Sequence, residues 1–296
     1  MTVRTTACLL GLLASGFPNG IRGADLGTIS FFDIPGASNT VPLSINADGV
    51  IVGRCRIAGM VHGFVRDQAG NFTIIDVPGA NFTVTAAINN HGDIVGMYGV
   101  PTSSTGRHGY LLKDGVITTF DPPGSTFTNA LGINDRGDVV GRYAVGNEPE
   151  HGFLLRDGVF TTLDVPGATR TDAFGINDRE EIVGGFLTAD GHSQIFVFSD
   201  GVYSIIVPPG QNVSLDKGAI SARGDIVGQY CDAAFPCVFG AGLHGFLYNA
   251  DGFTTIDVPG APGTAAFGIN APGTIVGSYV DAHGAAHGFM VTRGDD

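Results

Sequence analysis

The 296-residue chain has no tryptophan, two lysines, four glutamates and four cysteines. Its 15 Lys and Arg residues face 28 Asp and Glu residues, which gives a formal net charge of −13. With so little positive charge the sequence offers no basic stripe that could neutralise a phosphate backbone, so nucleic acid is not an expected partner. The same shortage argues against an anionic membrane surface as a partner.

Long apolar runs are also missing, except at the start of the chain. Arg4 precedes an apolar stretch over residues 7–17, which is the pattern of a secretory signal peptide rather than of a short buried helix. We predict a signal peptide over residues 1–24, with cleavage between residues 16 and 24. No later run reaches the ~18 apolar residues that a membrane span requires. The expected product, residues 25–296, is secreted into an extracellular or periplasmic space.

The four cysteines are too few for a disulfide framework, but their spacing predicts one bridge. Cys8 falls within the predicted signal peptide. Cys231 and Cys237 lie six residues apart in a segment without counterpart elsewhere, so in an oxidising compartment we predict a disulfide between them. A zinc site is the alternative, although the spacing is not that of a zinc knuckle and no second pair follows. Cys55 is then left unpaired.

No window has the 3.6-residue apolar period of a helix, and the chain instead repeats a unit of about 43 residues six times. Four signatures recur in order: a hydrophobic residue with Asp-X-Pro-Gly, then Ile-Asn, then Val-Gly, then His-Gly-aromatic. The fifth copy is degenerate at four of these positions, which are Gln194, Ile195, Val207 and Ser221. Such regular repetition predicts one domain built from stacked or radial units.

The sequence pattern of each unit predicts four strands, which are separated by turn signals such as Asp157-Gly158. Four strands in about 43 residues is the size of a propeller blade. The chain begins with one strand of a hairpin, 28–33, and ends with the complementary strand, 287–292, so these strands can pair. We therefore predict a six-bladed β-propeller of four-stranded antiparallel blades, closed by pairing of the N- and C-terminal strands. A solenoid is the alternative, but its open edges would need caps.

Length variation is confined to one loop in each repeat. The distance from the Ile-Asn position to the Val-Gly glycine is always seven residues, whereas the distance from that glycine to the histidine varies from 9 to 16. Variable loops of repeat proteins lie on one face, which is often the binding face. The six loops are 54–61, 97–107, 142–150, 185–193, 229–243 and 278–286.

The recurring histidine and aspartate are predicted to face each other across the hairpin, because both lie equally far from its turn. The predicted pairs are His62 with Asp76, His108 with Asp121, His151 with Asp164, His244 with Asp257, and His287 with Asp33. The fifth repeat loses both members together, as a paired interaction predicts. A metal-binding or proton-relay ring is the alternative, but we interpret the pairs as structural hydrogen bonds.

Residues in the variable loops are the candidates for contact with a ligand. Tyrosine offers both an apolar face and a hydroxyl group, although a packed tyrosine is the structural alternative. The candidate ligand contacts are Arg142, Tyr98, Tyr143, Tyr230 and Tyr279. Glu148 and Glu150 are candidate catalytic carboxylates. No nucleophile motif, phosphate loop or zinc signature is present, so neither a cofactor nor a metal is expected.

These signatures resemble those of the HAF extracellular-repeat family. The segment His151-Gly-Phe-Leu-Leu-Arg-Asp-Gly-Val-Phe-Thr-Thr-Leu-Asp-Val-Pro-Gly167 is similar to one typical copy, and it is followed by Ala173-Phe-Gly-Ile-Asn177 and Ile182-Val-Gly184. The similarity covers nearly all of residues 29–292. It implies a bacterial exported protein, and it assigns no reaction.

The sequence thus predicts a secreted binding or interaction scaffold that acts through its variable loops, with a glycan, a peptide or a protein as ligand. The alternative is an enzyme that processes an extracellular polysaccharide or peptide, with carboxylates at one mouth of the propeller. A passive surface or matrix component is a third hypothesis. Specific ligand binding separates the first from the third, and turnover separates the second from both.

Overall fold

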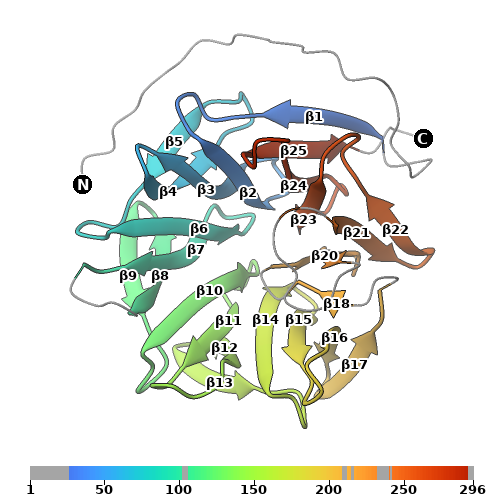
Figure 1. Ribbon diagram of the computed structural model, residues 1–296. Helices are drawn as coiled ribbons and strands as arrows, with labels where there is room; N and C mark the ends of the chain where they lie inside the picture. The colour runs from blue at the N-terminus through green and yellow to red at the C-terminus, as the bar shows by residue number, and fades with distance from the viewer. Residues whose placement is uncertain are drawn as a thin grey trace.

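The computed structural model describes residues 27–101, 106–208, 212–214, 217–231, 240 and 242–292. Within these residues every regular element is a β-strand, and the sheets stand around a central axis in a propeller arrangement (Figure 1). The predicted all-β class and the propeller arrangement are therefore confirmed. In the described part of the chain no helix has the length and apolarity needed to cross a membrane. The predicted signal peptide over residues 1–24 lies outside the described residues.

The first three repeats supply two sheets. One sheet is β2 (Asn39–Ile45), β3 (Ile51–Ile57), β4 (Met60–Arg66) and β5 (Phe72–Ile75). The other contains β6 (Phe82–Ile88), β7 (Ile94–Gly99), β8 (Arg107–Lys113), β9 (Val116–Phe120), β10 (Phe127–Ile133), β11 (Val139–Ala144), β12 (His151–Arg156) and β13 (Val159–Leu163).

The last three repeats supply three further sheets. The first is β14 (Arg170–Ile176), β15 (Ile182–Leu187), β16 (Ser193–Ser199) and β17 (Val202–Ile206). The second is β18 (Asn212–Val213), β19 (Ala219–Ile220), β20 (Ile226–Cys231), β21 (Leu243–Asn249) and β22 (Gly252–Ile256). The third is β23 (Gly263–Ile269), β24 (Ile275–Val280), β25 (Ala286–Thr292) and β1 (Thr28–Phe32).

The prediction of six separate four-stranded blades is wrong. Among the described residues only four sheets are separate blades, and the remaining sheet combines two repeats. The strands of the second and third repeats form one eight-stranded sheet, joined where β8 and β10 pair in parallel at Arg107 and Phe127. The Arg107 guanidinium lies 5.2 Å from the centre of the Phe127 ring, and this contact accompanies the close approach of the two backbones. In the fifth repeat the inner strand is split into β18 and β19.

The terminal strands pair with each other, as the sequence predicts. β1 runs antiparallel to β25, with Phe31 opposite Phe289, and the two lie side by side in Figure 1. A hydrogen bond of 2.8 Å between the Asp33 carboxylate and the His287 Nδ1 atom strengthens this junction. The ring of sheets is therefore joined by strands from opposite ends of the sequence.

The core of each repeat depends on the glycine of the Val-Gly signature. Gly141 lies opposite Phe153 in the sheet, and a Cβ atom at Gly141 would be 2.0 Å from the Asn129 carbonyl and 2.7 Å from the Phe153 ring. Only glycine leaves room for both groups. The corresponding aromatic residues are fully buried in all repeats, and they are Phe64, Tyr110, Phe153, Phe196, Phe246 and Phe289. The Val-Gly and His-Gly-aromatic signatures thus form one packing unit.

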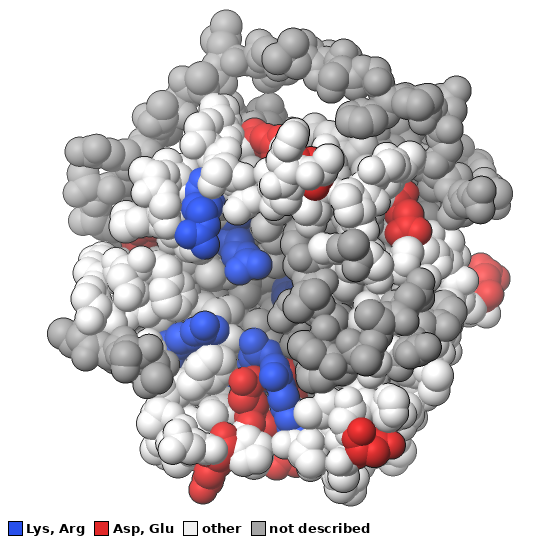
Figure 2. All heavy atoms as spheres, in the orientation of Figure 1, with Lys and Arg blue, Asp and Glu red and all other residues white. Residues whose placement is uncertain are grey.

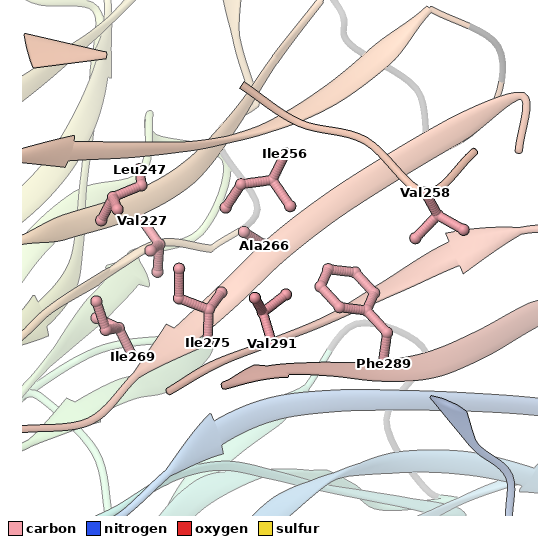
Figure 3. Packing of buried hydrophobic residues seen from close by; sticks show 9 residues of the cluster. All are labelled: Val227, Leu247, Ile256, Val258, Ala266, Ile269, Ile275, Phe289 and Val291. Atoms are coloured by element: carbon pink, nitrogen blue, oxygen red, sulfur yellow. The ribbon is translucent and has the colours of Figure 1, made fainter. Parts of the chain in front are cut away.

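Apolar side chains also join one repeat to the next. Figure 3 shows a cluster in which Val227 and Leu247 of the fifth repeat lie beside Ile275 and Phe289 of the sixth. Burial of each such side chain contributes about 1.5–3 kcal/mol relative to its exposure to water. Packing between neighbouring repeats therefore also stabilises the ring.

Polar bonds between repeats come from the asparagine of the Ile-Asn signature, which forms what we call the asparagine belt. Each Nδ2 donates to the backbone carbonyl at the same position of the next repeat. The bonds run from Asn46 to Asn89 (3.4 Å), Asn89 to Asn134 (3.1 Å), Asn134 to Asn177 (3.3 Å), Asn177 to Ser221 (3.1 Å) and Asn270 to Asn46 (3.0 Å). The sequence predicts only the turn-capping role of these residues.

The same asparagines cap their own turns, so each amide has two functions. The Oδ1 atom of Asn134 accepts from the backbone nitrogens of Arg136 (3.1 Å) and Asp138 (2.9 Å). In the fifth repeat the shorter Ser221 keeps these caps, since its Oγ accepts from Arg223 and Asp225, both at 3.1 Å. Serine thus preserves the cap, and only asparagine adds the belt bond.

Substitution of Asn134 separates the two functions. We expect Asn134→Ser to lower the free energy of unfolding by about 1 kcal/mol, because only the amide donor is lost, and Asn134→Ala by about 2–3 kcal/mol, because the turn cap is lost as well. Urea denaturation followed by circular dichroism measures both values. Equal losses for the two variants would show that the belt bond contributes nothing.

Candidate functional site

One end of the central channel opens into a cavity of about 560 Å³, which we call the axial cavity. Five inner strands of the described residues carry a β-bulge, and four of the unpaired bulge residues line this cavity. They are Leu43 in β2, Ala86 in β6, Leu131 in β10 and Phe267 in β23. At the opposite end, the asparagine belt surrounds a much smaller space of about 90 Å³.

The axial cavity lies on the side of the variable loops. Its wall includes Arg54 and Val61 from the first loop region, Met97 and Arg107 from the second, and Gly284 from the last. The predicted clustering of several loops around one mouth is present. The structure therefore joins an enclosed space to the part of each repeat that varies most in length.

Positive charge is concentrated in this cavity although the protein as a whole is acidic. Five of the chain's 15 basic residues line it, and no Asp or Glu is among its lining residues. Figure 2 shows Lys and Arg side chains gathered around the hollow at the centre of this face. The basic lining residues are Arg54, Arg56, Arg107, Arg142 and Lys217.

Arg142, a predicted ligand contact, belongs to an ion-pair network beside the cavity. It lies 3.2 Å from the Glu150 carboxylate and 3.3 Å from that of Asp172. Arg170 binds the same two carboxylates, at 3.0 Å and 2.8 Å. Burial raises the pKa of Asp172, whereas the two arginines act in the opposite direction. This network balances two positive with two negative charges, so it holds Arg142 in place.

Arg107 and Arg56 have no such carboxylate partner within 4 Å among the described residues. The Arg107 guanidinium lies 5.8 Å and 5.2 Å from the centres of the Phe82 and Phe127 rings. Burial lowers the pKa of Arg107, the like charge of Arg142 lowers it further, and Glu150 partly compensates. Arg56 donates to the Gly59 carbonyl at 2.8 Å. Neither guanidinium is paired with a carboxylate among the described residues, and Glu150 offsets the positive charge of Arg107 only in part.

Lys217 is the buried amine of the cavity. Its Nζ donates to the carbonyl of Leu131, the bulge residue of β10, and only 5% of the residue is exposed. Burial lowers the pKa of Lys217 to about 7. The amine therefore changes its charge near neutral pH, in a space that a ligand can reach.

The four predicted ligand tyrosines do not line the axial cavity and pack on the hairpins instead. Each ring lies against the histidine of its own repeat, with centroid distances of 5.4 Å for Tyr98, 5.5 Å for Tyr143, 5.2 Å for Tyr230 and 5.2 Å for Tyr279. The hydroxyl groups of Tyr143 and Tyr230 share hydrogen bonds with Thr162 and Thr255. In the first repeat the small Cys55 replaces the tyrosine and lines the cavity.

The structure places all five predicted histidine–aspartate pairs within hydrogen-bond distance through Nδ1. The distances are 2.9 Å for His62 and Asp76, 2.7 Å for His108 and Asp121, 2.8 Å for His151 and Asp164, 2.9 Å for His244 and Asp257, and 2.8 Å for His287 and Asp33. Each pair ties the two strands of one hairpin, and none of these residues lines the axial cavity. No cluster of three potential metal ligands exists within the described ranges.

The predicted catalytic carboxylates are not brought together as a working pair. Glu148 is exposed, and Glu150 is held between Arg142 and Arg170. Cys231 is disulfide-bonded, but its predicted partner Cys237 lies outside the described residues, so that pairing stays a prediction. Cys55 is a free, buried thiol, and burial raises its pKa to about 12.

Sequence reasoning missed Arg54, Arg56, Arg107 and Lys217. Two positions in each repeat carry a signal that could have found Arg54 and Arg107, whereas Arg56 lies at neither position. The residue after Val-Gly lines the channel at Arg54, Met97 and Arg142, and the residue before the histidine lines it at Val61, Arg107 and Ala286. Lys217 lies where the fifth inner strand is interrupted, and no repeat position predicts it.

These features define an all-β protein with a β-propeller arrangement and a basic axial cavity. No family model matches the chain, and no curated protein matches it. The resemblance to HAF repeats therefore stays a prediction.

Solved structures share the fold at low identity. An Aleuria aurantia lectin mutant in complex with Fucα1-6GlcNAc is 12% identical, with a TM-score of 0.54 over 86% of this chain and 91% of that one. The β-propeller domain of the trilobed protease from Pyrococcus furiosus is 13% identical, with a TM-score of 0.54 over 87% and 79%. A Trypanosoma rangeli sialidase is 10% identical, with a TM-score of 0.56 over 86% of this chain and 54% of that one.

The buried amine predicts a pH-dependent stability. Since Lys217 binds its proton less tightly in the folded state, the free energy of unfolding rises with pH above about 7. Below that value the amine is protonated in both states, and this contribution no longer changes with pH. Relative to a Lys217→Met variant, the wild-type protein should gain roughly 2 kcal/mol between about pH 6 and about pH 8.5. Denaturant titrations of both proteins across this range give the difference.

The comparison stays below about pH 9 because Cys55 changes stability in the opposite direction above it. Lys217→Met removes the charge while keeping a long side chain, so it is the matched control for titration. A difference between the two proteins that does not vary with pH would contradict a buried, readily deprotonated amine.

Proposed function

We propose that this protein is a secreted binding module that holds part of its ligand in the axial cavity. The observation that carries the proposal is the position of the cavity, which has a volume of about 560 Å³ and opens among the variable loops. This volume falls within the ~300–1,000 Å³ typical of sites for small organic ligands. A glycan, a peptide or an exposed segment of a protein could each place a group of that size there.

Export is part of the proposal. The predicted signal sequence over residues 1–24 supports it, and so does the disulfide at Cys231, since disulfides persist in oxidising compartments. The similarity of repeat signatures to extracellular HAF proteins points in the same direction. Fractionation of an expressing bacterial culture, followed by N-terminal sequencing, tests both export and the cleavage site.

An enzyme that processes an extracellular polymer remains the second candidate, and Glu150 is the observation that favours it. This carboxylate lies on Arg142, which lines the cavity, so it is close to the space that a substrate would occupy. Two arginines bind it, however, so its carboxylate is already engaged by the protein. Glu150 is thus better suited to positioning Arg142 than to general acid catalysis.

Filling the axial cavity tests the binding module. Ala86 is the bulge residue of β6, and Phe267 occupies the same place in β23, so Ala86→Phe fits the local backbone while reducing the cavity. We expect it to weaken binding at least about tenfold, because a ligand would have to displace the ring. Binding is first screened with immobilised neutral and acidic oligosaccharides and peptides, and hits are then titrated by calorimetry.

Ala222→Phe is the control, because Ala222 lies at the opposite end of the channel. It should leave the affinity unchanged. Failure of the whole panel to bind, or binding that Ala86→Phe leaves intact in a folded protein, would overturn the proposal. Turnover of a bound probe that Glu148→Gln or Glu150→Gln abolishes would favour the enzyme instead.

A further inference from the structure

The axial cavity has a charge opposite to that of the protein around it. The whole chain has a formal net charge of −13, whereas the residues that line the cavity include five bases and no acid. Nearby, Asp172 and Glu150 are already engaged by Arg142 and Arg170. Among the described residues, Arg56 and Arg107 have no carboxylate partner within 4 Å.

Like charges held together in one cavity repel each other, and this costs folding free energy unless a counter-charge is present. The effect is visible at Arg107, whose pKa is lowered by burial and by the nearby Arg142. An anion between these side chains would relieve the repulsion and recover the hydrogen bonds that guanidinium groups make with acid oxygens. The arrangement is therefore incomplete without a negative ligand.

The basic residues occupy two levels of the cavity. Arg56 and Arg107 are exposed and lie at its mouth, whereas Arg142 and Lys217 are largely buried. Apolar side chains such as Val41, Met97 and Phe82 share the lining with them. A ligand that matches both levels carries more than one acid group on a partly apolar body, and the volume of about 560 Å³ exceeds what a single inorganic ion fills.

We propose that the axial cavity binds a short organic polyanion, with Arg56 and Arg107 holding one acid group at the mouth and Arg142 and Lys217 facing another within. The inference rests on the proposed binding function and names the chemical class of its ligand. Carboxylate, sulfate and phosphate groups share the required chemistry. A long polyanion is disfavoured, because its ends would lie over the acidic surface outside the cavity.

The test measures affinity by calorimetry for four short probes and one polymer. Trigalacturonate, a sulfated disaccharide and inorganic triphosphate represent the three acid groups, galactotriose is the uncharged counterpart of the first, and polygalacturonate is the polymer. At least one acidic probe should bind, and galactotriose should bind at least about tenfold more weakly. Added salt should lower the affinity for the acidic probe. The polymer should bind no more tightly per site than the trimer.

Single substitutions identify which positive charges of the cavity bind the acidic probe. Arg107→Gln and Arg56→Gln should each weaken the acidic probe about tenfold, as expected for loss of a charged hydrogen bond. Arg223→Gln is the matched control, because Arg223 is exposed near the other end of the channel, and it should have no effect. Thermal denaturation of each variant checks that it is folded.

The outcomes separate this inference from the function on which it rests. Salt-independent binding of galactotriose that Ala86→Phe abolishes would keep the binding module and overturn the acidic ligand. Acid binding that Arg107→Gln and Arg56→Gln leave unchanged would also overturn it. Tighter binding of the polymer would overturn the restriction to short ligands. Binding of none of the acidic probes would overturn this inference alone, because the binding module is tested by the wider panel of oligosaccharides and peptides.

Discussion

The hydrogen bond that each side-chain amide of the asparagine belt donates is the constraint on which the rest of this structure depends. Each Nδ2 reaches the carbonyl of the next repeat, while the Oδ1 of the same residue holds its own turn closed. Five inner strands thus end at a turn that is fixed in relation to the next repeat. The spacing of the inner strands, and with it the width of the channel, follows from a side chain that occurs in five of the six repeats.

The two ends of the channel differ because different kinds of interaction surround them. At the belt end the side chains satisfy one another, and little space is left. At the other end the variable loops meet, bulge residues line the wall, and five basic side chains gather with no Asp or Glu among the lining residues. Positive potential at the bottom of a hollow in an acidic protein focuses the field there and attracts small anions in preference to the surrounding surface.

The sequence predicts the parts of the fold that recur and misses those that do not. The hairpin pairing of His151 with Asp164 and the terminal junction at Phe31 and Phe289 follow from repeat arithmetic. The number of separate blades could not be predicted in this way, because the merging of two repeats depends on one backbone contact between Arg107 and Phe127. Spacing within a repeat does not specify such contacts between repeats.

The axial cavity could not be predicted from the sequence for a related reason. Its basic residues come from different repeats and from different positions, so no local motif contains two of them except Arg54 and Arg56. Overall composition indicates an acidic protein and conceals a basic interior. The Tyr residues, which the sequence makes conspicuous, pack against the hairpin histidines, because an aromatic ring beside an imidazole–carboxylate pair is buried best there.

The bond between His287 and Asp33 joins residues 254 positions apart, and this separation has a kinetic consequence. The sheet that contains β1 and β25 cannot be completed until residue 287 has been synthesised, so this contact raises the contact order and delays the final folding step. Until β25 is available to pair with β1, the hydrogen-bonding edge of β1 stays exposed. A polypeptide that completes its fold so late stays longer in a loosely folded state with an open sheet edge.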